Sequence, residues 1–224
     1  MAVPEMTSKA HTVLDHANGS TKGFFDAFDV IRRGKAAGRT AHVEQDQLRA
    51  ALVFAAAGLD SVFKELIRGA VPMLAIFDVD VRRELETFVR RQLRGEADEP
   101  GASLGTKFLA RVLIADSPMT GVIEDYILEL TGSSLQSASQ VVKTLKALGL
   151  NHREVVPDLD ELDNIFRIRN QIIHELDVNL RAQQGHRDRN DRAIDEMVSY
   201  AMTLLEIARS ALSLVDAKFE APGG

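Results

Sequence analysis

Apolar residues recur along almost the whole chain at the spacing of one face of an α-helix. No stretch shows the alternation of apolar and polar residues that is typical of a half-buried strand, and no fixed-period repeat is found. The pattern therefore predicts an all-α protein. The expected helices cover residues 8–34, 43–70, 80–94, 105–115, 119–131, 134–148, a segment that includes 162–180, and a last helix from 188–191 to about 217.

Glycine, proline and capping residues set the expected helix ends. Gly19 and Gly23 predict a first helix that is weak or broken, and the sequence GAVP predicts that the second helix ends there. Ser133 or Ser134 is expected to cap a short helix, and Asp158 is expected to cap the penultimate helix.

The stretch GEADEPGASLG predicts a linker after the third helix, because glycine and proline occur there among acidic residues. We therefore expect a helical arm over 1–40 ahead of a helical bundle over 41–220, with a linker and short inserted helices over 95–150.

Composition narrows the class of protein. The chain of 224 residues has no cysteine, which excludes disulfides, thiolate metal sites and cysteine nucleophiles. The N-terminal stretch lacks the pattern of a signal peptide, and no apolar run reaches the length of a membrane span, so we expect a soluble cytoplasmic protein without a membrane partner. The net charge of −6 argues against broad nonspecific coating of DNA, although it leaves room for a local basic groove.

The second predicted helix is apolar around most of its circumference between Leu48 and Phe63. Such a helix is central in its bundle or buried in a subunit interface. Asp60 lies at the edge of the apolar zone and is a candidate counter-ion for Arg169. The alternative is a local pair between Asp60 and Lys64, four residues later, on a face that meets solvent.

The penultimate predicted helix carries an arginine within its apolar stripe. Arg169 falls near the middle of the stripe, and Asn170 and His174 flank it one helical turn apart. A buried guanidinium is costly unless it is paired or faces a cleft or a partner chain. We therefore expect Arg169 to face a carboxylate, a cleft or a second subunit.

The run Arg169-Asn170-Gln171-Ile172-Ile173-His174 spells R-N-x-x-x-H, which resembles the signature of HEPN domains. The stretch 48–67 also looks like the early long helix of the HEPN branch found beside RNA ligase-type proteins. The resemblance covers roughly residues 43–216. It implies a HEPN-like antiparallel helical bundle, and HEPN proteins with an intact motif are typically metal-independent endoribonucleases that act as dimers.

The residue types fit that chemistry. In metal-independent cleavage of RNA, the 2′-hydroxyl attacks the adjacent phosphate, and a histidine such as His174 transfers protons near neutral pH. Arg169 supplies fixed positive charge for the pentacovalent phosphate, and Asn170 fixes the imidazole or holds a phosphate oxygen. The expected partners are RNA and a second copy of the chain, with no metal or cofactor. The alternative is a noncatalytic HEPN module that binds a nucleotide or a protein partner.

Several further arginines are candidates for RNA contact. Arg167 lies beside the motif, although its alternative is a solvated pair with Asp163. Arg181, Arg187 and Arg189 follow the motif helix, in a stretch that contacts a nucleic-acid backbone or is simply a hydrophilic connection.

Many bacterial HEPN proteins are stress or defence effectors, so the resemblance also implies a toxin-like role with an antitoxin or other regulatory protein. The sequence His174-Glu175-Leu176 departs from the H-x-Y of HEPN toxins whose tyrosine is adenylylated. The departure puts that mode of regulation in doubt.

Overall fold

The computed structural model describes residues 5–33, 41–94, 104–114, 117–179 and 189–220. These residues form α-helices and one short 3-10 helix (Glu5–Thr7), with no β-strand among them, which confirms the predicted all-α class. The α-helices are α1 (Ser8–Arg32), α2 (His42–Phe77), α3 (Val79–Arg94), α4 (Leu104–Ile114), α5 (Pro118–Thr131), α6 (Ala138–Ala147), α7 (His152–Val155), α8 (Leu159–Glu175) and α9 (Ile194–Glu220).

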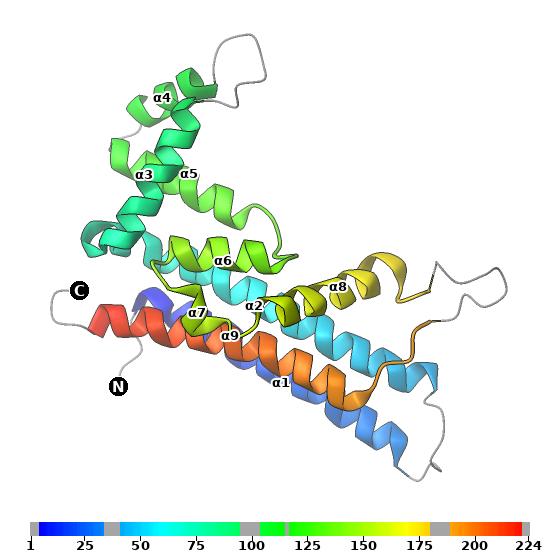
Figure 1. The fold of residues 1–224 in the computed structure, drawn as a ribbon. Helices are drawn as coiled ribbons and strands as arrows, with labels where there is room; N and C mark the ends of the chain where they lie inside the picture. Colours follow the sequence, from blue (N-terminus) through cyan, green and yellow to red (C-terminus); the bar gives the residue numbers. More distant parts are fainter. Residues whose placement is uncertain (1–4, 34–40, 95–103, 115–116, 180–188, 221–224) are drawn as a thin grey trace.

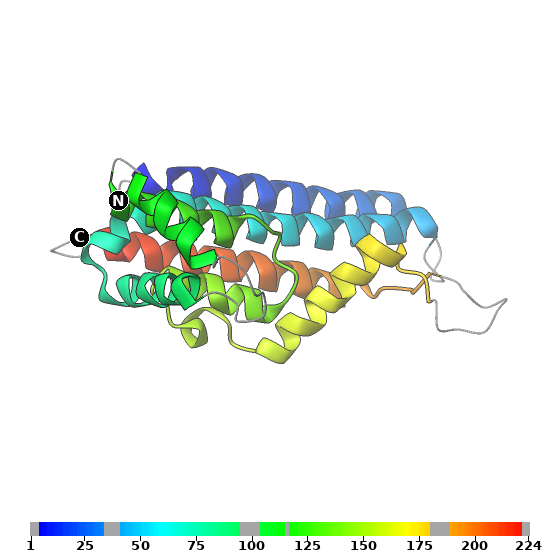
Figure 2. The same ribbon diagram turned by 90° about the horizontal axis from the view of Figure 1, so that it is seen from above.

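Three long helices form the body of the molecule. Figures 1 and 2 show α1, α2 and α9 side by side along their lengths, with α3, α4 and α5 gathered near the chain termini. Helix α8, which carries the R-N-x-x-x-H motif, packs across the part of α2 that lies away from the chain termini. The expected arm is thus not set apart, because α1 buries Ala10, Leu14, Ala17 and Phe28 in the same core as α2.

Helix α2 is central, as its apolar circumference predicts. Leu48, Leu52, Leu59 and Leu66 are fully buried along it. Gly58 lets α1 approach closely, because a Cβ there would lie 2.4 Å from the Cβ of Ala17. Glycine in this helix therefore serves packing between helices rather than a break in the chain.

Two expected helix breaks are wrong. α2 continues through Pro72 to Phe77, because Val71 and Leu74 on either side of the proline are buried in the core. α1 continues through Gly19 and Gly23, because both lie on its open side, where an added Cβ would meet no atom within 4 Å. In both helices, tertiary packing outweighs the local propensity to end.

The structure shows which of the predicted helix N-termini are correct. Asp158 caps α8 as predicted, since its Oδ1 accepts hydrogen bonds from the backbone N–H groups of Asp160 and Glu161 at 2.9 Å each. The expected cap at Ser133 or Ser134 is wrong. α6 begins later, at Ala138, and Ser137 caps it. The last helix also begins later than expected, at Ile194.

Among the described helices, α9 alone has the length and hydropathy of a membrane span. A core helix of a soluble protein meets the same criteria. In the bundle, α9 packs on α2 and α1, and Ala201, Leu204, Ala208 and Leu212 are buried.

Candidate functional site

One line of side chains on α8 faces away from the core. Asp163, Asn170 and His174 lie within about 40° of one another around the helix axis, and Arg167 lies beside them. The opposite side of α8 buries Leu162, Ile165, Phe166, Ile168 and Ile172. The amphipathic pattern that drives α8 onto the bundle therefore also fixes which polar side chains remain open.

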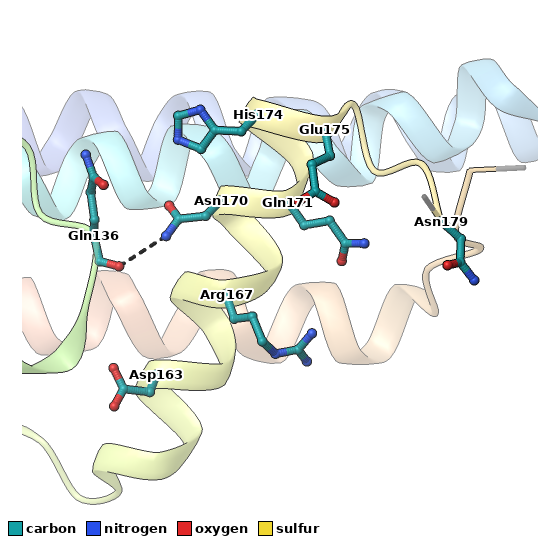
Figure 3. Close-up of a pocket in the computed structure, with 8 residues that line it drawn as sticks. All are labelled: Gln136, Asp163, Arg167, Asn170, Gln171, His174, Glu175 and Asn179. Carbon is teal, nitrogen blue, oxygen red and sulfur yellow. Dashed lines mark hydrogen bonds between the residues drawn. The ribbon is translucent and has the colours of Figure 1, made fainter. Parts of the chain in front are cut away.

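These side chains line a pocket of about 730 Å³. Its lining residues are Gln136, Asp163, Arg167, Asn170, Gln171, His174, Glu175 and Asn179. Figure 3 shows Asp163, Asn170 and His174 extending from one side of α8, the side on which Gln136 lies. The structure thus brings together two of the three predicted catalytic residues and Arg167.

Arg169 does not line this pocket but is joined to it. Its Nη1 donates a hydrogen bond to Oδ1 of Asn170 at 2.9 Å. The guanidinium is partly buried, and its Nε is enclosed without a hydrogen-bond partner in the described part of the chain. Burial lowers the pKa of Arg169 from its ordinary value, and the nearby carboxylate of Asp60 works in the opposite direction. Part of this cation is therefore held in place without full compensation.

Asp60 forms the local ion pair with Lys64, which is one of the two pairings that the sequence allows. Its Oδ2 lies 2.8 Å from Nζ of Lys64, and its Oδ1 accepts a hydrogen bond from the backbone N–H of Leu135 at 2.9 Å. Among the described contacts, it forms no ion pair with Arg169 and acts on that residue only through its electric field. Its side chain is mostly buried rather than open to solvent.

The connection between α5 and α6, residues 132–137, forms a wall of the pocket, and we call it the wall loop. Side chains from two helices hold it: Asp60 bonds Leu135, while Nδ2 of Asn170 donates to the carbonyl of Gln136 at 3.2 Å. Directly after the loop, the backbone N–H of Ala138 donates to Oδ1 of Asp163 at 2.8 Å. The wall loop is therefore positioned by the same helix that carries the motif.

A buried ionic cluster fixes the chain after the motif helix. α8 ends in a left-handed turn at Leu176 (φ 51°) and Asp177 (φ 60°). Asp177 is fully buried and accepts hydrogen bonds from Nε of Arg49 at 2.8 Å, from Nε of Arg192 at 3.1 Å and from Nδ2 of Asn190 at 3.0 Å. We call these four residues the Asp177 clamp.

The clamp links three distant parts of the chain. Burial works against ionisation of Asp177, but the hydrogen bonds from Arg192, Arg49 and Asn190 outweigh it and hold the pKa of the carboxyl below its usual value. Arg192 also donates to Oε1 of Gln171, a pocket residue, at 3.3 Å. Through this hydrogen bond, the clamp also holds Gln171, which lines one side of the pocket.

The candidate RNA-binding arginines have different surroundings. Arg189 donates to the carbonyl of Leu176 at 2.9 Å and pairs with Asp46 at 2.7 Å, so it stabilises the turn after α8. Arg167 donates to Oδ1 of Asn164 at 2.6 Å rather than pairing with Asp163. Arg181 and Arg187 lie outside the described residues.

Sequence reasoning missed the pocket residues Gln136, Gln171, Glu175 and Asn179, and the partners of Asp177. A signal existed for one partner, because Arg49 stands among apolar residues of α2 just as Arg169 does in α8. Within the described ranges, no three histidine, aspartate or glutamate side chains lie together as a metal site would require.

No family model, curated protein or solved structure matches this chain. The resemblance to HEPN domains therefore rests on the residues of the motif and of α2, and it stays a prediction.

Proposed function

We propose that this chain is a metal-independent endoribonuclease of the HEPN type that acts in the cytoplasm as a homodimer. The pocket along α8 supports the proposal, because the imidazole of His174 and the amide of Asn170 line it. The guanidinium of Arg169 donates a hydrogen bond to that amide. A volume of about 730 Å³ is in the range of sites for small organic molecules, so a nucleotide unit fits it.

In the proposed reaction, an imidazole takes the proton of an RNA 2′-hydroxyl, and the oxygen attacks the adjacent phosphorus. The bond from phosphorus to the 5′-oxygen breaks, and a second group protonates that oxygen. The products are a 2′,3′-cyclic phosphate and a 5′-hydroxyl. Arg167 and Arg169 supply positive charge where the phosphorane oxygens become more negative.

The reaction uses two proton-transfer groups, and the described pocket holds one imidazole, from His174. A second copy of the chain supplies the other. A charge-free strip on α2 supports this assembly, and it consists of Val43, Gln47, Ala50, Phe54 and Ala57. Val43 and Phe54 are 58% and 46% exposed, although the opposite face of α2 forms the core. A partly exposed strip without charges on a central helix favours a two-fold interface, with the Phe54 ring already packed on Phe24 of α1 at its edge.

The activity is tested by incubating the purified protein with total RNA in EDTA. We expect cleavage that leaves 2′,3′-cyclic phosphate ends, and a loss of at least about 100-fold in His174→Ala, as is typical for removal of a general acid or base. Arg169→Ala should also abolish cleavage. His16→Ala and Arg153→Ala are matched controls, because both residues are exposed on other helices.

Two results would count against the proposal. Cleavage that persists in both His174→Ala and Arg169→Ala places the chemistry elsewhere. A folded wild-type dimer that cleaves none of a varied set of RNAs favours a noncatalytic module that binds a nucleotide or protein partner.

A toxin-like role in stress or defence is part of the same proposal. Expression should then arrest growth, and His174→Ala should relieve the arrest while His16→Ala does not. A neutralising antitoxin or other regulatory protein would act on this same activity.

A further inference from the structure

Two side-chain amides line the pocket near His174, and they differ in what they already bind. The amide of Asn170 is engaged at both polar atoms, because its Oδ1 accepts from Arg169 at 2.9 Å and its Nδ2 donates to the carbonyl of Gln136 at 3.2 Å. The hydrogen bonds that Gln136 makes within the described part of the chain come from its backbone. Asn170 therefore holds the wall loop, whereas the side-chain amide of Gln136 is left for a ligand.

The side chain of Gln136 is directed to the end of the pocket that suits a phosphate. Figure 3 shows it extending from the wall loop toward the imidazole of His174. The carboxylate of Asp163 is eleven residues from His174, which is roughly 16 Å along the axis of α8. Because a carboxylate repels a phosphate, a bound phosphate belongs at the His174 end, where the amide of Gln136 points.

The backbone that carries this amide is fixed by its surroundings. The N–H groups of Leu135, Gln136 and Ala138 donate to side-chain oxygens at 2.9, 2.5 and 2.8 Å, and the carbonyl of Gln136 accepts from a side-chain amide. The side chains that make these four hydrogen bonds are those of Asp60, Gln140, Asp163 and Asn170. On binding a ligand, Gln136 therefore has to order only its own side chain.

We infer that Gln136 is a further catalytic residue of this pocket, whose Nε2 donates a hydrogen bond to a nonbridging oxygen of the scissile phosphate; the inference rests on the proposed function. A side-chain amide is a donor that carries no charge. The nonbridging oxygens become more negative as the 2′-oxygen adds to phosphorus. A donor placed there therefore stabilises the transition state more than it stabilises bound RNA.

The test measures kcat and KM for cleavage of a short single-stranded RNA in EDTA. Gln136→Ala should lower kcat roughly 10- to 100-fold, the range for losing one hydrogen bond to a charged group, with a much smaller change in KM. Its Tm should stay at the wild-type value, because the backbone hydrogen bonds remain. Ser134→Ala changes an exposed residue of the same wall loop outside the pocket, and it should leave kcat unchanged.

Two further variants distinguish contact with the phosphate from a structural role. Gln136→Lys keeps a donor at the end of the side chain and should restore most of the kcat that Gln136→Ala loses. Gln136→Glu has nearly the shape of glutamine but presents a carboxylate, which repels the phosphate, so its kcat should fall below that of Gln136→Ala. Equal losses in all three variants would overturn the contact.

The pH dependence of cleavage gives a second criterion. An amide does not titrate near neutral pH, so kcat of Gln136→Ala should follow pH with the same shape as in wild type, at a lower rate. A changed shape would mean that Gln136 acts on the protonation of His174 rather than on the phosphate, and it would overturn the inference.

Failure of the ribonuclease proposal has a different signature. If the wild type cleaves no RNA, that proposal fails, and the contact is decided by NMR of nitrogen-15-labelled protein titrated with the same RNA. The side-chain amide signal of Gln136, identified by its loss in Gln136→Ala, should shift on binding. The signal of Gln92, which donates to Glu129 away from the pocket, should not. An unmoved Gln136 signal overturns the contact.

Discussion

Removing the carboxylate of Asp177 should destabilise the protein far more than removing a comparable exposed carboxylate. Asp177 is fully buried, and its loss leaves Arg49, which is 3% exposed, with only the carbonyl of Asn190 and the exposed Asp46. Breaking a buried ion pair by removing one partner costs about 3–5 kcal/mol, because the remaining charge stays buried. For a chain of this length, each kcal/mol lowers Tm by roughly 2–4 °C, so Asp177→Ala should lower it by about 6–20 °C.

Asp46→Ala is the matched control for this experiment. Asp46 also accepts from Arg49, at 3.1 Å, but its side chain is 48% exposed, so its loss should cost less than about 1 kcal/mol. Thermal and urea denaturation followed by circular dichroism measure both variants. Equal losses for Asp177→Ala and Asp46→Ala would refute the claim that the clamp is a buried, stabilising cluster.

Three further perturbations test other parts of the structure. The lowered pKa of Asp177 means that its stabilisation is present above about pH 4 and is lost as pH falls through the folded-state pKa. Tm should therefore fall more steeply in wild type than in Asp177→Asn below about pH 4. Phe54→Glu should shift the proposed dimer to monomer in sedimentation velocity, whereas Met202→Glu, on α9 and exposed to a similar extent, should not. The Phe54 ring also packs on Phe24 of α1, so this variant should lose some Tm as well. Gly69→Ala should lower Tm, because its Cβ would lie 2.0 Å from a carbonyl oxygen of the short helix preceding α1, whereas Gly23→Ala should raise stability by about 0.5–1 kcal/mol.

Local and periodic features of the fold were predictable from the sequence. The apolar period located every described α-helix except the single turn α7, and the cap at Asp158 is a contact between near neighbours. The end of α2 was not predictable, because the local signal of Pro72 is outweighed by burial of side chains against other helices. Helical periodicity states which face is buried, not which helix covers it.

In the candidate site too, features within one helix were predictable, whereas contacts between helices were not. Periodicity identified Arg169 as an exception in an apolar stripe and placed His174 beside it. It did not show that Arg49 has its carboxylate 128 positions later, at Asp177, or that the wall loop is held by side chains of α2 and α8. Such pairings join segments far apart in sequence, and their partners become neighbours only after the helices pack.

The geometry of α8 determines what the proposed reaction requires. Arg169 and His174 are five residues apart and therefore project about 140° from one another around the helix. Asn170 lies between them and touches Arg169, but the pocket that holds His174 does not include the guanidinium. One copy of α8 therefore cannot direct both groups at one phosphate without a change of side-chain conformation. The flank of α8 that carries Arg169 also buries Ile165 and Ile172 against the bundle, so in the proposed dimer a second imidazole would have to approach through the pocket, beside the Asn170 to which Arg169 is bonded. A monomer that cleaves RNA at the rate of the dimer would contradict this requirement, even if His174 proves essential.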